Sequence, residues 1–80
     1  MFINKTNDGK NNICGDTVSE FRKNKGISQR ELADQLQILG LDVDKNAIQR
    51  IECGKRFVTD IELRTLKKVF NCSYEDLLRD

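Results

Sequence analysis

Residues 28–56, SQRELADQLQILGLDVDKNAIQRIECGKR, decide the fold of this chain. Ser28 can cap a free backbone N–H, and Glu31, three residues later, completes a capping box, so a helix is expected to begin here. Apolar residues then recur at helical spacing until Gly40. A second helix is expected to begin after Asp44, which can cap it, and to end at Gly54. The stretch therefore predicts two short amphipathic helices joined by a connection.

Three further helices are expected outside this stretch. The first begins at about Ile13 or Asp16 and ends at Asn24, before Gly26, a residue suited to a helix end. The other two begin with capping boxes, the second of them weaker, at Thr59 with Glu62 and at Ser73 with Asp76. β-branched residues do not alternate between turns anywhere in the sequence. The predicted fold class is all-α, a compact domain of five helices.

The chain is expected to divide at about residue 12. Residues 3–12, INKTNDGKNN, are too polar to bury enough apolar surface to offset the entropy of ordering them. This composition predicts a flexible N-terminal arm over residues 1–12 and a folded domain over residues 13–80. Lys5 and Lys10 of the arm could reach a minor groove or a phosphate, although a solvated tail is the favoured interpretation.

The composition argues against several classes of function. The chain has no His, and its three cysteines include no close pair, whereas a structural zinc site normally needs four Cys or His ligands. We therefore expect free thiols, no metal and no cofactor. Without a nucleophile and base, or a phosphate-binding loop, we expect no catalytic residue and no enzyme. Without an apolar run of about 20 residues or a secretory signal, we expect a soluble cytoplasmic protein. So short a chain also has little room for a small-molecule effector.

The outer side of the second helix in residues 28–56 carries the candidate binding residues. Asn46 and Arg50 are four residues apart and project from the same side, where Asn can bind adenine and Arg can bind guanine. Lys45 can bind guanine or phosphate, and Gln49 can donate to a base or lie at the groove wall. Just beyond the helix, two basic residues are placed for phosphate contact, namely Lys55 and Arg56. Taken alone, such a face is equally typical of a solvated amphipathic helix.

The neighbouring sequence favours a binding face over a merely solvated one. Ser28-Gln29, Leu32-Ala33 and the run from Ala47 to Arg56 together resemble the lambda-repressor-like helix-turn-helix family, also called Cro/CI or XRE. The resemblance extends from about Gly15 to Leu78. It implies a five-helix domain that binds double-stranded operator DNA, usually as a two-fold homodimer. It also implies roles for individual positions. Those expected to meet DNA bases or phosphates are Gln29, Lys45, Asn46, Gln49 and Arg50, and those expected to form a structural ion pair are Arg22 and Glu52.

One segment departs from the family pattern. Residues 37–43 make the connection between the second and third helices about five residues longer than usual. The segment can add a turn to the second helix or form a longer loop. The added turn is favoured because four apolar residues of the segment need a surface to bury against: Ile38, Leu39, Leu41 and Val43.

Two functional hypotheses follow from these observations. The leading one is a sequence-specific DNA-binding transcriptional regulator, expected to be a repressor, that inserts its third helix into the major groove. The formal net charge is only +1, so its positive charge must be concentrated on one face. The alternative is a protein-interaction module of the same fold, such as an antitoxin or an antagonist of another regulator. Phe70, Leu77 and Leu78 could support such an interface, although packing of the last helix onto its own core is favoured.

Overall fold

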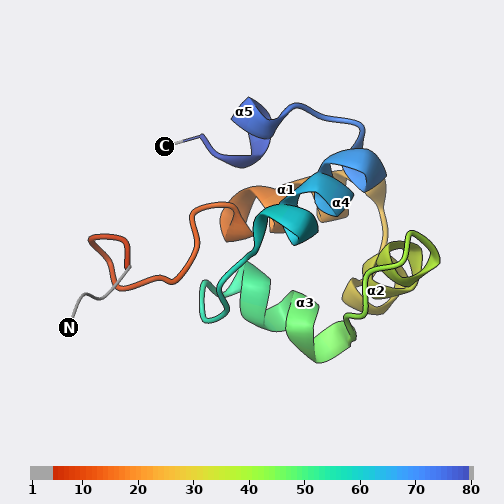
Figure 1. Ribbon diagram of the computed structural model, residues 1–80, viewed down its shortest axis with the longest axis horizontal. Coiled ribbons are helices and arrows are strands. Elements are labelled where there is room, and N and C mark those ends of the chain that lie inside the picture. The colour runs from red at the N-terminus through yellow and green to blue at the C-terminus, as the bar shows by residue number, and fades with distance from the viewer. Residues whose placement is uncertain (1–4, 80) are drawn as a thin grey trace.

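The computed structural model describes residues 5–79, which form five α-helices and no strand (Figure 1). The all-α, five-helix fold predicted from the sequence is therefore confirmed. The helices are α1 (Gly15–Lys25), α2 (Gln29–Ile38), α3 (Lys45–Glu52), α4 (Asp60–Phe70) and α5 (Tyr74–Leu77). No helix within the described residues is long and apolar enough to cross a membrane.

Short polar residues start four of the helices, as the sequence indicates. The Ser28 hydroxyl accepts a hydrogen bond from the Glu31 N–H, and the Glu31 carboxylate accepts one from the Ser28 N–H. Equivalent reciprocal pairs begin α4 and α5, and the Asp44 carboxylate caps α3 by accepting from the Ala47 N–H. These bonds satisfy backbone donors that have no partner within their own helix. They set where each helix starts, and thereby which of its sides faces inward.

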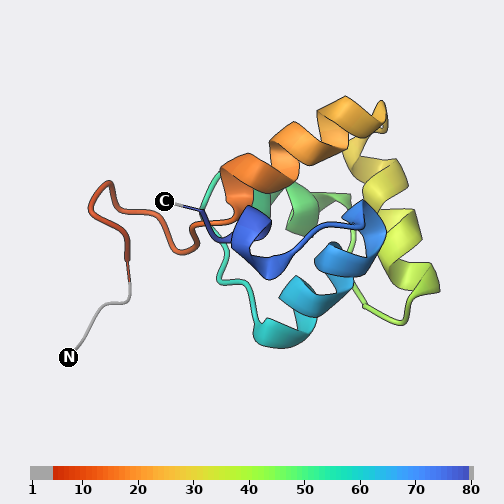
Figure 2. The same ribbon diagram turned by 90° about the horizontal axis from the view of Figure 1, so that it is seen from above.

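The core is aliphatic and receives at least one residue from every helix. It consists of Cys14, Val18, Leu32, Ala33, Leu36, Val43, Ile48, Ile51, Leu66 and Leu77. α5 contacts both α1 and α4 and lies on the opposite side of the domain from α3 (Figures 1 and 2). α3 packs chiefly on α2 and α1. The core therefore supports one side of α3 and leaves its other side directed outward.

The long connection after α2 combines the two outcomes considered for it. α2 continues two residues past Leu36, to Ile38, and the chain then turns through Gly40 into a loop that reaches Asp44. Val43 is buried, as expected of an apolar residue. The expectation of burial was wrong for Ile38 and Leu39, which are 83% and 49% exposed. The reason is that the loop turns back to bury Val43 and is bonded there by the Gln37 side chain, which donates to the Val43 carbonyl at 2.7 Å.

Residues 10–12 of the expected N-terminal arm make contacts with the folded domain that the sequence did not reveal. These residues are hydrogen-bonded to the folded domain, as detailed below, and Thr6 to Lys10 form a turn through Gly9, whose φ is 81°. A polar composition does not exclude order here. Asparagine side-chain amides can donate hydrogen bonds to backbone carbonyls that have no helical partner at the end of a helix. Residues 1–4 of the expected arm lie outside the described residues.

Candidate nucleic-acid interface

The outer face of α3 is defined by Lys45, Asn46, Gln49 and Arg50. All four residues are exposed, while Ile48 and Ile51 on the opposite side of the same helix are 0% and 1% exposed. Within residues 5–79, none of the four side chains forms a hydrogen bond or an ion pair. The connection before α3 does not cover them. This face is therefore open to a partner on a helix whose other side is fixed in the core.

A buried polar cluster fastens the end of α3 to α1 and α2. The Glu52 carboxylate accepts from Arg22 Nε at 2.7 Å and Nη2 at 3.1 Å, and from Gln29 Nε2 at 3.1 Å. The side chains of Arg22 and Glu52, which were expected to pair, are only 13% and 7% exposed. The hydrogen bonds to Glu52 raise the pKa of the Arg22 guanidinium above its usual value. Since one carboxylate joins three helices, the orientation of α3 is tied to the core.

Gln29 lies at the first position of α2 and is half-buried. Its side chain was expected to contact DNA, whereas in the structure its amide nitrogen donates to Glu52. A Gln amide carries an oxygen as well as a nitrogen, so this bond does not use all its hydrogen-bonding capacity. The structure thus brings Gln29 into the fastening cluster, at the edge of the candidate interface.

The two basic residues after α3 differ in their surroundings. Lys55 is exposed and its side chain forms no ion pair within residues 5–79. The guanidinium of Arg56 instead pairs with Glu62, whose side chain is 8% exposed. Glu62 also accepts the Thr59 N–H, so the pair joins the loop after α3 to the start of α4. Both residues were expected at phosphates, and the carboxylate partner of Arg56 within the chain was not expected.

Sequence reasoning also missed a clamp formed by Asn11 and Asn12. Asn12 Nδ2 donates to the Ile51 and Arg56 carbonyls at 3.1 and 2.7 Å. Asn11 donates from its backbone N–H to the Gly54 carbonyl and from Nδ2 to the Lys55 carbonyl. These carbonyls belong to the last turn of α3 and to the loop after it, where backbone acceptors have no N–H partner within the helix. The N-terminal segment therefore positions the loop that carries Lys55.

Gly54 fits this clamp for a steric reason. Its φ is 78°, and a Cβ added there would lie 2.7 Å from Cγ of Lys10. The aliphatic part of the Lys10 side chain thus covers the glycine directly. A larger residue at this position would meet both an unfavourable backbone conformation and an occupied space.

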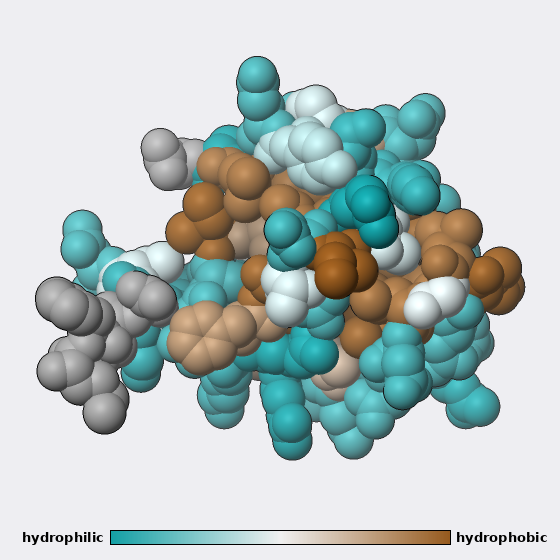
Figure 3. Space-filling model, in the orientation of Figure 1, coloured by the Kyte–Doolittle hydropathy of each residue, from teal (hydrophilic) through white to brown (hydrophobic). Residues whose placement is uncertain are grey.

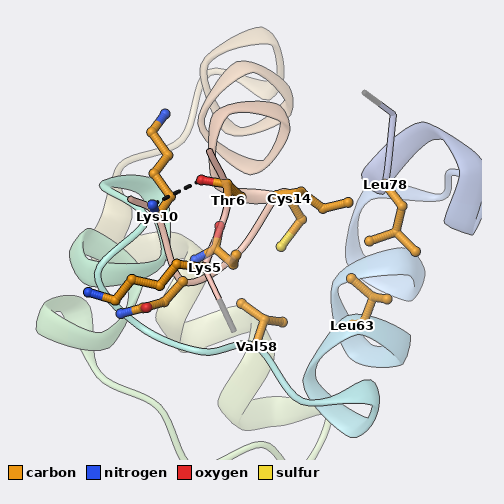
Figure 4. Close-up of a pocket in the computed structure, with 10 residues that line it drawn as sticks. Lys5, Thr6, Lys10, Cys14, Val58, Leu63 and Leu78 are labelled. Carbon is orange, nitrogen blue, oxygen red and sulfur yellow. Dashed lines mark hydrogen bonds between the residues drawn. The ribbon is translucent and has the colours of Figure 1, made fainter. Parts of the chain in front are cut away.

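A cavity of about 590 Å³ separates this N-terminal segment from α4 and the end of the chain (Figure 4). Figure 4 shows Val58, Leu63 and Leu78 around it, with the Cys14 thiol directed among them and the Lys10 amine directed away. Burial raises the pKa of the Cys14 thiol to about 11, so the thiol stays protonated at neutral pH. Within residues 5–79, no group of three or more His, Cys, Asp or Glu side chains could hold a metal ion.

Comparison with known proteins agrees with this geometry. A family model described as helix-turn-helix matches residues 18–77. The chain belongs to this helix-turn-helix family. The family is of the XRE, or lambda-repressor-like, type. Among solved structures, the chain is similar to the restriction-modification controller protein C.AhdI from Aeromonas hydrophila, with 25% identity and a TM-score of 0.69 over 80% of this chain and 86% of that one. No curated protein sequence matches the chain. The helix-turn-helix protein is thus a DNA-binding transcriptional regulator.

The three free thiols provide a test of the structure around this interface. Cys53, at the end of α3, is exposed, whereas Cys14 is 1% exposed. We expect a maleimide at pH 7 to label Cys53 rapidly and Cys14 only after global unfolding, as measured by mass spectrometry of the peptides. Equal labelling of Cys14 and Cys53 in the native protein would contradict this placement.

The raised pKa of Cys14 also predicts how stability depends on pH. The pKa of this thiol rises from 9.0 to about 11 on folding. The contribution of Cys14 to the free energy of unfolding should therefore be constant below about pH 9 and fall between about pH 9 and 11, as the unfolded chain loses the thiol proton.

Proposed function

We propose that this helix-turn-helix protein represses transcription by inserting α3 into the major groove of a specific operator. The observation that carries the proposal is the exposed face of Lys45, Asn46, Gln49 and Arg50, which has no partner among the described residues and lies on a helix held by a buried cluster. The major groove of B-DNA is about 12 Å wide and admits an α-helix. Occupying an operator would exclude polymerase or another regulator without any chemical step.

The proposed contacts divide by their chemistry. Asn46 and Arg50 read base edges, because each can make a bidentate pair with one kind of base. Lys45 and Gln49 contact base edges or the phosphates beside them, and Gln29 contacts the backbone at the start of α2. Beyond α3, the proposed phosphate contacts come from Lys55 and, more weakly because of its pairing with Glu62, from Arg56.

We further propose that the protein binds as a homodimer to two half-sites about one helical turn, or about 34 Å, apart. A single short recognition helix reads few base pairs, so a two-fold pair of helices supplies a longer specific site. The likeness to C.AhdI, a restriction-modification controller protein, makes the genes of such a system the first candidates for control.

Selection from a random DNA duplex library tests the proposal. We expect a recurring palindromic sequence whose preference at one base pair of each half-site relaxes when the selection is repeated with Arg50→Ala. The competing interpretation is an interaction module such as an antitoxin, which predicts no enriched sequence even at low salt and a stoichiometric protein that co-purifies. Enrichment by the Arg50→Ala variant of a sequence with unchanged preference at every position would contradict the docking of α3.

Lys55→Ala should weaken binding to all duplexes by a similar factor. Its ammonium group is exposed and is proposed to contact phosphate, which carries no sequence information. We expect the slope of log affinity against log salt concentration to decrease by about one unit, as measured by fluorescence anisotropy between 50 and 200 mM salt. Arg56→Ala is the matched comparison and should change the slope less, because Glu62 already pairs with that guanidinium. An unchanged slope for Lys55→Ala would exclude this phosphate contact.

A further inference from the structure

The cavity between the N-terminal segment and α4 has an apolar wall. Its volume of about 590 Å³ lies within the range of about 300–1,000 Å³ that is usual for small-molecule sites. The wall is formed by Ile13, Cys14, Val58, Leu63 and Leu78. Ile13 and Leu78 are 47% and 40% exposed, so the cavity opens to the surface between them. Figure 3 shows apolar side chains gathered beside the C-terminal end of the chain, in the same region.

One polar atom of the cavity lining has no partner. Within residues 5–79, Asn11 Oδ1 is the only buried side-chain nitrogen or oxygen that forms no hydrogen bond. Buried polar atoms are nearly always hydrogen-bonded, so an acceptor without a partner requires an explanation. A molecule in the cavity reaches this shielded oxygen once a neighbouring side chain moves. Lys5 also lines the cavity, is exposed and forms no ion pair within the described residues, so it can move at little cost.

The other side-chain oxygens of the lining are already used. Asn12 Oδ1 accepts the Gly15 N–H at 2.9 Å, and Thr6 Oγ1 accepts the Lys10 N–H at 2.9 Å. No Asp or Glu lines the cavity. A hydrogen-bond donor that enters the cavity therefore has Asn11 Oδ1 as its one unused side-chain acceptor among the lining residues.

The two donors of Asn11 connect this oxygen to the loop after α3. The backbone N–H of Asn11 donates to the Gly54 carbonyl at 2.7 Å, and its Nδ2 donates to the Lys55 carbonyl at 2.9 Å. A hydrogen bond accepted by Oδ1 restrains the same side-chain amide whose nitrogen holds Lys55. A molecule in the cavity is thus linked to that loop through a single side chain.

We propose that this cavity binds a small molecule with an apolar body and a hydroxyl group, such as an alkylphenol, and that the hydroxyl donates to Asn11 Oδ1. The apolar body lies against Val58, Leu63 and the uncharged thiol of Cys14. Bound in this way, the molecule is an effector that strengthens binding to DNA. This consequence rests on the proposed function, because it requires Lys55 to contact phosphate. A loop that is already held by the ligand loses less conformational entropy when it meets the duplex.

A pair of related compounds tests the site on the protein alone. We expect 4-propylphenol to cause saturable shifts in the backbone amide NMR signals of the cavity residues and of Gly54 and Lys55. 4-Propylanisole has the same body but carries a methyl ether, so it cannot donate to Asn11. It should bind about 3- to 10-fold more weakly, the factor expected for one hydrogen bond. Equal affinities would overturn Asn11 as the acceptor, and no saturable shift with either compound would overturn the site.

Leu78→Asp tests whether the compound occupies this cavity. Leu78 is the C-cap residue of α5 and is 40% exposed, so a carboxylate there can remain solvated in the free protein. A bound apolar body would cover that carboxylate, and we expect the affinity for 4-propylphenol to fall by about 10-fold or more. Leu39→Asp is the matched control, since Leu39 is the C-cap residue of α2, is 49% exposed and lies outside the cavity. Unchanged affinity of the Leu78→Asp variant would overturn the cavity as the site.

Operator binding tests the effect on DNA separately. With the cavity saturated by 4-propylphenol, we expect the operator affinity of the wild type to rise by about 5-fold or more. The Leu78→Asp variant should show no such rise at the same concentration. Unchanged operator affinity of the saturated wild type would overturn the link from Asn11 to the loop. The titrations without DNA decide the site even if the chain binds no operator, so failure of the proposed function is distinguished from failure of this inference.

Discussion

Glu52→Ala should lower the free energy of unfolding by about 3–5 kcal/mol, the range found when one partner of a buried ion pair is removed. The Glu52 carboxylate is 7% exposed and accepts hydrogen bonds from Arg22 and Gln29. Without it, the Arg22 guanidinium stays largely buried with no opposite charge, and the Gln29 amide loses its acceptor. A domain of this size is only marginally stable, so the loss should be visible as partial unfolding. Urea denaturation followed by circular dichroism measures it.

Two variants show whether the effect comes from an unpaired buried charge. Glu75→Ala removes an exposed acid from α5 and should change stability by no more than about 0.5 kcal/mol. Arg22→Met combined with Glu52→Met removes both charges and should recover most of the stability lost by Glu52→Ala, because no charge is then left unpaired. A double variant as unstable as the sum of its two single variants would show that the pairing of charges is not what stabilises the cluster.

The helix starts could be predicted from the sequence because their causes are local. Ser28 and Glu31, or Thr59 and Glu62, are three residues apart, and a capping box requires only that spacing. The side of α3 that packs on the core could be predicted in the same way, since Ile48 and Ile51 recur at helical spacing. Rules that act within one turn of helix thus sufficed for the fold.

The features that the sequence did not reveal depend on residues far apart in the chain. Asn12 contacts the carbonyl of Ile51, 39 residues away, and nothing in a polar Asn-rich segment predicts that approach. Ile38 and Leu39 are apolar, yet whether they bury depends on where the connection turns. For Arg56, the nearby Glu62 was already assigned to a cap, although its second oxygen remained available for an ion pair.

The outer face of α3 could be named from helical periodicity, and the resemblance to a family supplied its proposed role. Periodicity alone does not distinguish a binding face from a solvated one, because both consist of polar side chains. The structure adds two physical facts: these side chains have no partner within the described residues, and the helix beneath them is fixed through Glu52. A rigid helix with free polar groups can bind a groove without first breaking internal contacts.

Arg50→Ala should weaken operator binding by about 1–3 kcal/mol, or roughly 5–150-fold, and relax the preference at one base pair. Arg50 is exposed on α3 and its side chain has no intramolecular partner within the described residues, so the loss should come from DNA contacts and leave stability nearly unchanged. Asn46→Ala, one turn earlier, should act similarly at a different base pair. Competition between the operator and duplexes altered at single positions measures both effects. Arg64→Ala is the control, since Arg64 is exposed on α4 and is not among the residues of the proposed interface. If the Arg50→Ala variant bound every duplex as tightly as the wild type, α3 could not be the helix that reads the operator.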